Sequence, residues 1–131
     1  MEETAGATAW ISRARFRELV TQALDGIPPA VQDTIRNVEI VVEDAPTTEV
    51  LASLGLAPEE ATLFGLYEGV PPIERGNDFP LLPDRIVLYY GSLTDAHRDE
   101  YHLRREVRRT IIHELGHHFG FDDRHLRGRG Y

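Results

Sequence analysis

Two histidines and a glutamate near the end of the chain have the types and spacing found in metal-dependent hydrolysis. They lie in the stretch His113-Glu114-Leu115-Gly116-His117. Residues four apart lie on one face of an α-helix, so both imidazoles can bind one metal ion. Glu114 is on the same side, within reach of a water bound to that ion. This is the H-E-x-x-H arrangement of zinc hydrolases, and it predicts His113 and His117 as zinc ligands and Glu114 as general base.

The residues after the second histidine predict the third ligand. A catalytic zinc takes three protein ligands and leaves one position open for water. Gly120 can close the helix in the left-handed conformation, and Asp123 follows three residues later. The motif therefore extends to H-E-x-x-H-x-x-G-x-x-D, with Asp123 as third ligand and nearby His125 as the alternative. Two histidines and an aspartate also suit iron, so the sequence favours one Zn²⁺ per chain without excluding another divalent ion.

A long helix must position these residues. Apolar residues recur every four positions before and through the motif, at Leu103, Val107, Ile111, Leu115 and Phe119. This stripe predicts a helix from Thr94 or Asp95 to Phe119, with room for a break around Tyr101. A second helix is expected from Ser12, which can cap it, to Gly26, followed by a short one over 29–35.

Three segments rich in β-branched or aromatic residues are expected as strands, over 38–42, 63–68 and 86–90. The last is apolar on both faces and should be central in the sheet. The segment 47–60 is ambiguous, and the proline-rich segment 70–84 is a loop, read as a simple connection or as a cleft wall. The predicted class is α+β, with a small mixed sheet of three or four strands packed on an N-terminal helix and a long C-terminal helix.

Composition limits the class of protein. With 131 residues, one domain over 1–131 is expected, with loose ends at 1–9 and 127–131. Cysteine is absent, so any zinc must be held by histidine and carboxylate. The net charge of −8 argues against nucleic acid as the main partner, and Arg104, Arg105, Arg108 and Arg109 read as a solvated helix face. No stretch has the length of a membrane span, so no membrane partner and a cytoplasmic location are expected.

The extended motif resembles that of metzincin-like zincins whose third ligand is aspartate, as in snapalysin. In size and order of elements, the chain is similar to a family of small bacterial zincin-like metallopeptidases. The resemblance runs from about Phe16 to Asp123 and includes Val42-Glu43-Asp44-Ala45-Pro46, Gly65-Leu66-Tyr67-Glu68-Gly69 and the run from Arg85 to Tyr90. It implies a minimal zincin-like fold with His113, His117 and Asp123 as ligands and Glu114 as base.

The same resemblance implies how a substrate is bound. In zincins, an edge strand at the rim of the cleft pairs with an extended peptide or protein substrate. That role falls here on Gly65, Leu66 and Tyr67, although ordinary sheet with turn-forming glycines is an equal alternative. Tyr67, Tyr89 and Tyr90 are candidates for stabilising the oxyanion, but packing is the better explanation for each.

One departure from the family pattern opens a second functional reading. Metzincins carry a methionine-containing turn beneath the metal, whereas the only methionine here is Met1. The leading prediction is a zinc-dependent peptidase. The alternative is a weak or inactive zincin-fold module that binds zinc and a peptide or protein partner.

Overall fold

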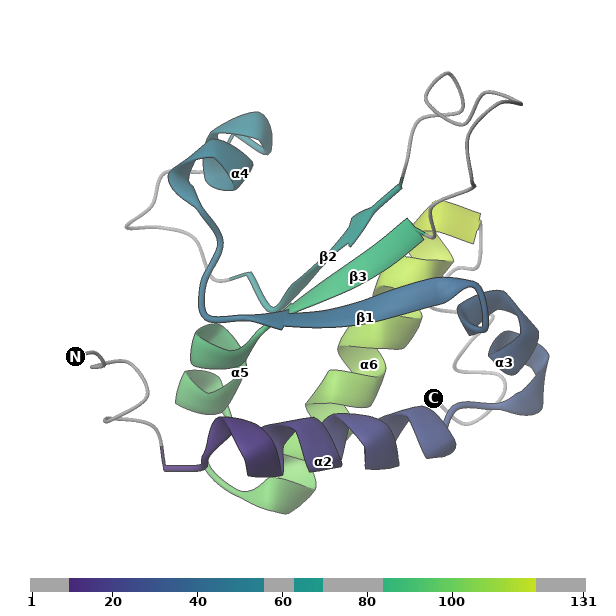
Figure 1. Cartoon of the computed structure of the whole chain (residues 1–131), viewed down its shortest axis with the longest axis horizontal. Coiled ribbons are helices and arrows are strands. Elements are labelled where there is room, and N and C mark those ends of the chain that lie inside the picture. Colours follow the sequence, from purple (N-terminus) through teal and green to yellow (C-terminus); the bar gives the residue numbers. More distant parts are fainter. Residues whose placement is uncertain (1–9, 56–62, 70–83, 120–131) are drawn as a thin grey trace.

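The structure is a computed structural model that describes residues 10–55, 63–69 and 84–119, with side chains up to 117. These residues form three strands and five helices. The helices are α2 (Arg13–Asp25), α3 (Pro29–Ile35), α4 (Thr48–Ser53), α5 (Tyr90–Ala96) and α6 (Glu100–Phe119). The strands are β1 (Val38–Glu43), β2 (Gly65–Glu68) and β3 (Asp84–Tyr89) (Figure 1). The predicted α+β class is confirmed.

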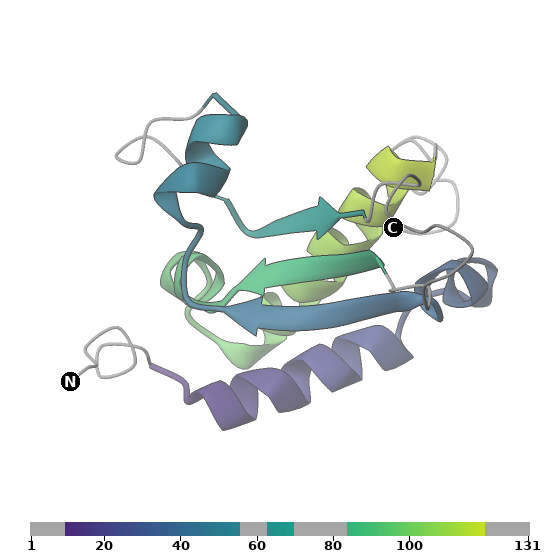
Figure 2. The ribbon, with the colours of Figure 1, turned by 45° about the horizontal axis from the view of Figure 1, so that its top comes forward.

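The sheet has the order β1-β3-β2 and is mixed (Figure 2). β1 pairs with β3 in parallel, and β2 pairs with β3 antiparallel. β3 is therefore central, as its apolar sequence predicts, and Ile86, Val87, Leu88 and Tyr89 are all buried. β2 is an edge strand, because no other described strand pairs with its outer side.

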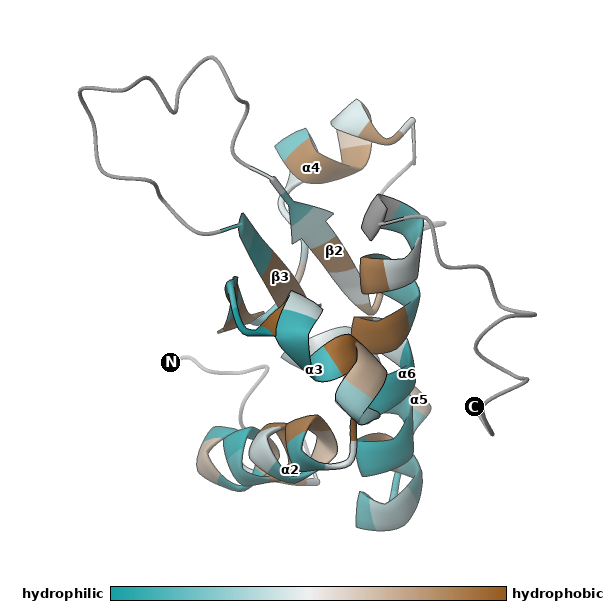
Figure 3. Ribbon diagram, turned by 90° about the vertical axis from the view of Figure 1, so that its right-hand side faces the viewer, coloured by the Kyte–Doolittle hydropathy of each residue, from teal (hydrophilic) through white to brown (hydrophobic). Residues whose placement is uncertain are grey.

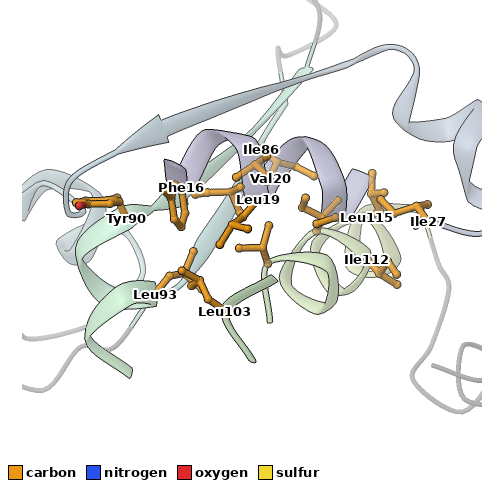
Figure 4. Close-up of a cluster of buried hydrophobic side chains, with 14 of the residues drawn as sticks. Phe16, Leu19, Val20, Ile27, Ile86, Tyr90, Leu93, Leu103, Ile112 and Leu115 are labelled. Carbon is orange, nitrogen blue, oxygen red and sulfur yellow. The ribbon is translucent and has the colours of Figure 1, made fainter. Parts of the chain in front are cut away.

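The main core lies between one face of the sheet and the helices α2 and α6 (Figure 4). Ile86 and Leu88 of β3 point into it and are fully buried. α6 contributes the predicted stripe, in which Leu103, Val107, Ile111 and Leu115 are each 0% exposed. α2 contributes Phe16, Leu19, Val20 and Ala23 from one face. α4 lies on the other side of the sheet from α2 (Figure 1).

Local signals explain the bounds of α2. The Ser12 side chain accepts a hydrogen bond from the Arg15 N–H at 3.1 Å, and Gly26 ends the helix. Hydrophobic and hydrophilic residues alternate along α2 and α6, as expected of helices with one face on a core (Figure 3). Within the described part of the chain, no helix is both long and apolar enough to cross a membrane.

The helix before the motif begins earlier than predicted. Instead of starting at Thr94 or Asp95, α5 begins at Tyr90, which the sequence placed in the strand. The Gly91 N–H donates to the Asp44 carbonyl at 2.9 Å, and a Cβ on Gly91 would lie 2.8 Å from that oxygen. This close approach turns the chain from strand to helix.

Other boundaries differ by smaller amounts. The break between α5 and α6 falls at 97–99 rather than around Tyr101. The ambiguous segment 47–60 contains α4, capped by the Thr47 side chain. β2 begins at Gly65 rather than at 63, and β3 covers 84–89 rather than 86–90. The loop 70–84 falls outside the described residues except at Asp84.

Candidate metal and peptide site

His113 and His117 lie side by side on α6. Their ring centroids are 4.2 Å apart, with the ring planes at 60°. Both side chains are exposed, while Leu115 between them is fully buried in the core. The core stripe therefore fixes the rotation of α6, so that the two imidazoles share one face outside the core. The structure brings these two predicted ligands together.

Glu114 is joined to the edge strand. Its Oε1 atom accepts a hydrogen bond from the Tyr67 backbone N–H at 3.0 Å, across 47 residues of sequence. The side chain is only partly exposed. Glu114 lines the same pocket as His113, and the hydrogen bond from the strand holds the orientation of its carboxylate.

The register of β2 explains why the Tyr67 N–H is available. The Tyr89 N–H donates to the Phe64 carbonyl at 2.9 Å, so this facing pair is hydrogen bonded. Antiparallel pairs alternate between bonded and non-bonded, which makes Leu66–Val87 bonded and Tyr67–Ile86 non-bonded. The backbone groups of Gly65 and Tyr67 therefore face away from β3, toward the outer side of β2.

Gly65 allows α6 to approach the strand. A Cβ at this position would lie 2.7 Å from Thr110 Cγ2 and 3.1 Å from the Val87 carbonyl. Thr110 is itself 8% exposed, so its methyl group has little room to move. The glycine is needed for helix packing, which is the close backbone approach that a glycine in a strand indicates.

A pocket of about 270 Å³ opens between β2 and α6. The strand side contributes Leu63, Phe64 and Gly65, and the helix side contributes Glu106, Arg109, Thr110, His113 and Glu114. The pocket therefore runs along the helix from the predicted catalytic residues toward the start of α6. This is a groove beside an open sheet edge, which suits an extended peptide.

The third predicted ligand, Asp123, lies outside the described residues, as does its competitor His125. Within the described ranges, no group of three potential metal-binding side chains converges. The donor set nevertheless fits zinc: two imidazoles in contact on one helix face leave room for a third ligand from a neighbouring segment. His113 and His117 could hold such an ion, and Glu114 lies between them in sequence.

Two of the tyrosine hydroxyls considered for the oxyanion are engaged elsewhere. The Tyr67 hydroxyl donates to Asp84 Oδ2 at 2.7 Å, and the Tyr90 hydroxyl donates to the Ile11 carbonyl in the core. Burial raises the pKa of Tyr90, and it also raises the pKa of Tyr89 together with the charges of Glu43 and Glu68. The hydroxyls of Tyr89 and Tyr90 therefore stay neutral. The position of Tyr90 is explained by its packing in the core.

Sequence reasoning missed the far end of the pocket. There, the Phe64 ring contacts the His97 ring with centroids 5.3 Å apart, and His97 Nε2 lies 3.6 Å from Glu106 Oε1. Glu106 also pairs with Arg109, at 3.4 Å. The sequence does contain a pattern that indicates this pocket wall, because Glu106, Arg109 and His113 recur at helical spacing on one face. The neighbouring arginines conceal it, since together they are typical of a solvated helix face.

Comparison with known proteins gives two similarities. Residues 35–131 match the family model described as zincin-like metallopeptidase. The structure is similar to that of a conserved hypothetical protein from Thermus thermophilus, with 27% sequence identity and a TM-score of 0.53. The alignment covers 90% of this chain and 99% of that protein. No curated protein sequence matches the chain.

Proposed function

Since this chain belongs to the zincin-like metallopeptidase family, we propose that it is a zinc-dependent peptidase with Glu114 as its general base. The observation that carries the proposal is that Glu114, which shares a pocket with His113 of the imidazole pair, is hydrogen bonded to the outer edge of β2. A carboxylate there can reach both a metal-associated water and a peptide lying along the strand.

The zinc ion would be held by His113, His117 and, from the sequence motif, Asp123. When bound, zinc acidifies water and polarises a carbonyl group. Glu114 accepts a proton from the attacking water and passes it to the leaving amine. The Tyr67 N–H keeps the carboxylate turned toward the cleft until substrate arrives.

The substrate would bind by strand addition. The outer side of β2 can pair with an extended peptide that takes the Tyr67 N–H in exchange for Glu114, while Leu66 lies on the alternate face of the strand. Such pairing is independent of sequence, because it uses backbone groups. The adjoining pocket then admits a substrate side chain.

The test is the Glu114→Gln chain. Glutamine keeps an oxygen to accept the Tyr67 N–H but cannot take up a proton. We expect about one zinc per chain by elemental analysis, as in the wild type, and peptide hydrolysis slower by about 10²- to 10⁴-fold. Unchanged hydrolysis would contradict the role of Glu114.

The third ligand can be tested in the same way. We expect Asp123→Ala to weaken zinc binding sharply, whereas Asp122→Ala and His125→Ala retain it. Zinc titration of the three variants against a competing chelator measures this. Loss of zinc on His125→Ala alone would transfer the role to that histidine.

The second candidate is a module that binds zinc and a peptide without appreciable turnover. The absence of any methionine after Met1 favours it, because the floor of the metal site must then be built without a methionine turn. An unstructured peptide library incubated with zinc-loaded chain, with and without chelator, separates the two. Intact peptides that are nevertheless bound support the module.

A further inference from the structure

The pocket beside the proposed catalytic residues has one apolar wall and one charged wall. Phe64 and Leu63 form the apolar wall, while Glu106 and Arg109 form the charged wall one to two turns of α6 before His113. The fold does not need an ion pair in the wall of this pocket for its stability. Glu106 and Arg109 are therefore candidates for contacts with a bound ligand.

His97 braces both walls. Its Nδ1 atom lies 2.9 Å from the Leu93 carbonyl, and its ring packs edge-on against Phe64. Its Nε2 atom faces Glu106 Oε1 at 3.6 Å, with both side chains about one-fifth exposed or less, at 18% and 20%. The same carboxylate oxygen, Glu106 Oε1, thus lies near both the imidazole and Arg109.

Arg109 is arranged differently. Its side chain is 67% exposed and meets Glu106 through Nη1 at 3.4 Å. A guanidinium has five N–H donors in a planar fork, so this single long contact leaves donor capacity for a ligand that enters the pocket Arg109 lines. Glu106 forms its ion pair with Arg109, and Arg109 is the more exposed of the two, at 67% against 20%.

We propose that Arg109 recognises a carboxylate of the bound peptide, within one or two residues of the bond that is cut. The proposal rests on the peptidase function above and adds a substrate class to it. Arg109 lies four residues before His113, about one helical turn or 5.4 Å along α6. An extended peptide advances about 3.3 Å per residue, so the spacing between Arg109 and His113 along the pocket corresponds to one or two peptide residues.

The carboxylate could belong to an aspartate or glutamate side chain or to the end of the peptide. Both present the same planar acceptor to the guanidinium. A cationic side chain would instead be repelled by the exposed positive charge of Arg109. An isolated, solvated helix ion pair is the alternative for Glu106 and Arg109, and it predicts no preference among ligands.

The test measures binding of fluorescent peptides to the zinc-supplied Glu114→Gln chain, which avoids turnover. In the first series, peptides with an amidated C-terminus carry one Glu, Gln or Lys, and each peptide has it at a different position. In the second series, peptides of decreasing length place a free C-terminal carboxylate at each of those positions. We expect Glu to bind about five- to tenfold more tightly than Gln at one or two positions. The free-carboxylate series shows which source of carboxylate is preferred.

Variants then assign the preference. Arg109→Ala should remove the difference between Glu and Gln, and Arg109→Glu should favour Lys. Arg105→Ala, which removes an exposed charge outside the pocket lining, should retain the preference. Equal binding of Glu and Gln at every position, or a preference that survives Arg109→Ala, would overturn the proposal.

Hydrolysis by the wild type separates this proposal from the proposed function. If zinc-loaded wild type leaves every peptide intact while binding to the Glu114→Gln chain still depends on Arg109, the carboxylate subsite stands and the peptidase function fails. If peptides are cut with no dependence on Arg109, the subsite fails and the peptidase function stands.

Discussion

At the scale of single residues, Glu114 combines two tasks. It lines a pocket together with His113 of the imidazole pair, and its carboxylate accepts a hydrogen bond from the Tyr67 N–H at 3.0 Å. A helix sets only the position of a side chain's Cα and Cβ atoms, and a glutamate has three further torsions to fix. The bond from the strand supplies that restraint before any substrate arrives.

This bond predicts a difference between two variants of Glu114 in metal-free protein. Glu114→Ala removes the acceptor and leaves the Tyr67 N–H without its protein partner, so we expect a loss of about 1 kcal/mol in unfolding free energy. Glu114→Gln keeps an acceptor and should lose less. Urea unfolding in chelator measures both, and equal midpoints would show that the bond contributes nothing to stability.

At the scale of elements, the site depends on how closely β2 approaches α6. Gly65 and Thr110 meet where a Cβ would be only 2.7 Å from the threonine methyl group. The Val87 carbonyl limits any shift in the other direction, at 3.1 Å. A side chain at this position must therefore separate the strand from the helix that carries the proposed ligands.

Gly65→Ala should accordingly destabilise the protein by about 1–3 kcal/mol. It should also weaken peptide binding, because the Tyr67 N–H and the outer edge of β2 move away from Glu114. Thr110→Ser, which deletes the clashing methyl group, should partly restore stability when combined with it. Thermal unfolding of the single and double variants measures this, and full additivity of the two effects would contradict the clash.

A second contact between elements joins α2 to α6. The Arg15 guanidinium donates to both carboxylate oxygens of Glu100, at 2.9 and 2.7 Å. These bonds hold the pKa of Glu100 below its ordinary value. A lowered folded-state pKa contributes stability above the unfolded-state pKa, and that stability is lost as pH falls through the folded-state pKa.

We therefore expect Glu100→Gln to be less stable than wild type at neutral pH, with the difference shrinking as pH falls below about 4.5. Unfolding midpoints measured from pH 7 to pH 3 give the difference. Glu49→Gln on α4 is the control, because Glu49 accepts a local bond from Thr48 and joins no second element. A gap that widens in acid would contradict the assignment.

The elements were largely predictable, since the apolar stripe of α6 and the run in β3 each repeat with the period of their structure. The pairing of the two predicted ligands, His113 and His117, was predictable too, because they interact within one helix. Contacts between distant segments were not: the Glu114–Tyr67 bond depends on strand register, and the α5 start depends on Gly91 meeting Asp44. The proposed Arg109 subsite could not be predicted either, because it depends on how Phe64 and His97 pack against α6.

At the scale of the whole molecule, the proposed site lies between the edge strand β2 and α6, and both elements pack on the main core. The ligand-bearing turn of α6 follows directly from buried Ile111 and Ile112, and Leu115 lies within it. Metal bound there interacts only with the folded arrangement of its ligands. Zinc binding should therefore stabilise the entire cooperative unit.

We expect zinc at about a thousand times its dissociation constant to add about 4 kcal/mol of stability, which corresponds to about 15 °C in thermal midpoint. The gain should disappear in chelator and in His113→Ala. His102→Ala, on an exposed part of the same helix, should keep it. A midpoint that zinc does not raise in wild type would contradict metal binding by the native state.

The position of β2 at the edge of the sheet also has a consequence for solubility. Sheet edges with accessible backbone donors and acceptors recruit strands from other molecules, and proteins commonly protect them with charged side chains. The carboxylate of Glu114 occupies the Tyr67 donor on that edge. A residue proposed for chemistry would thus also discourage self-association, and replacing it with alanine would leave a strand more prone to edge-to-edge pairing between copies of the chain.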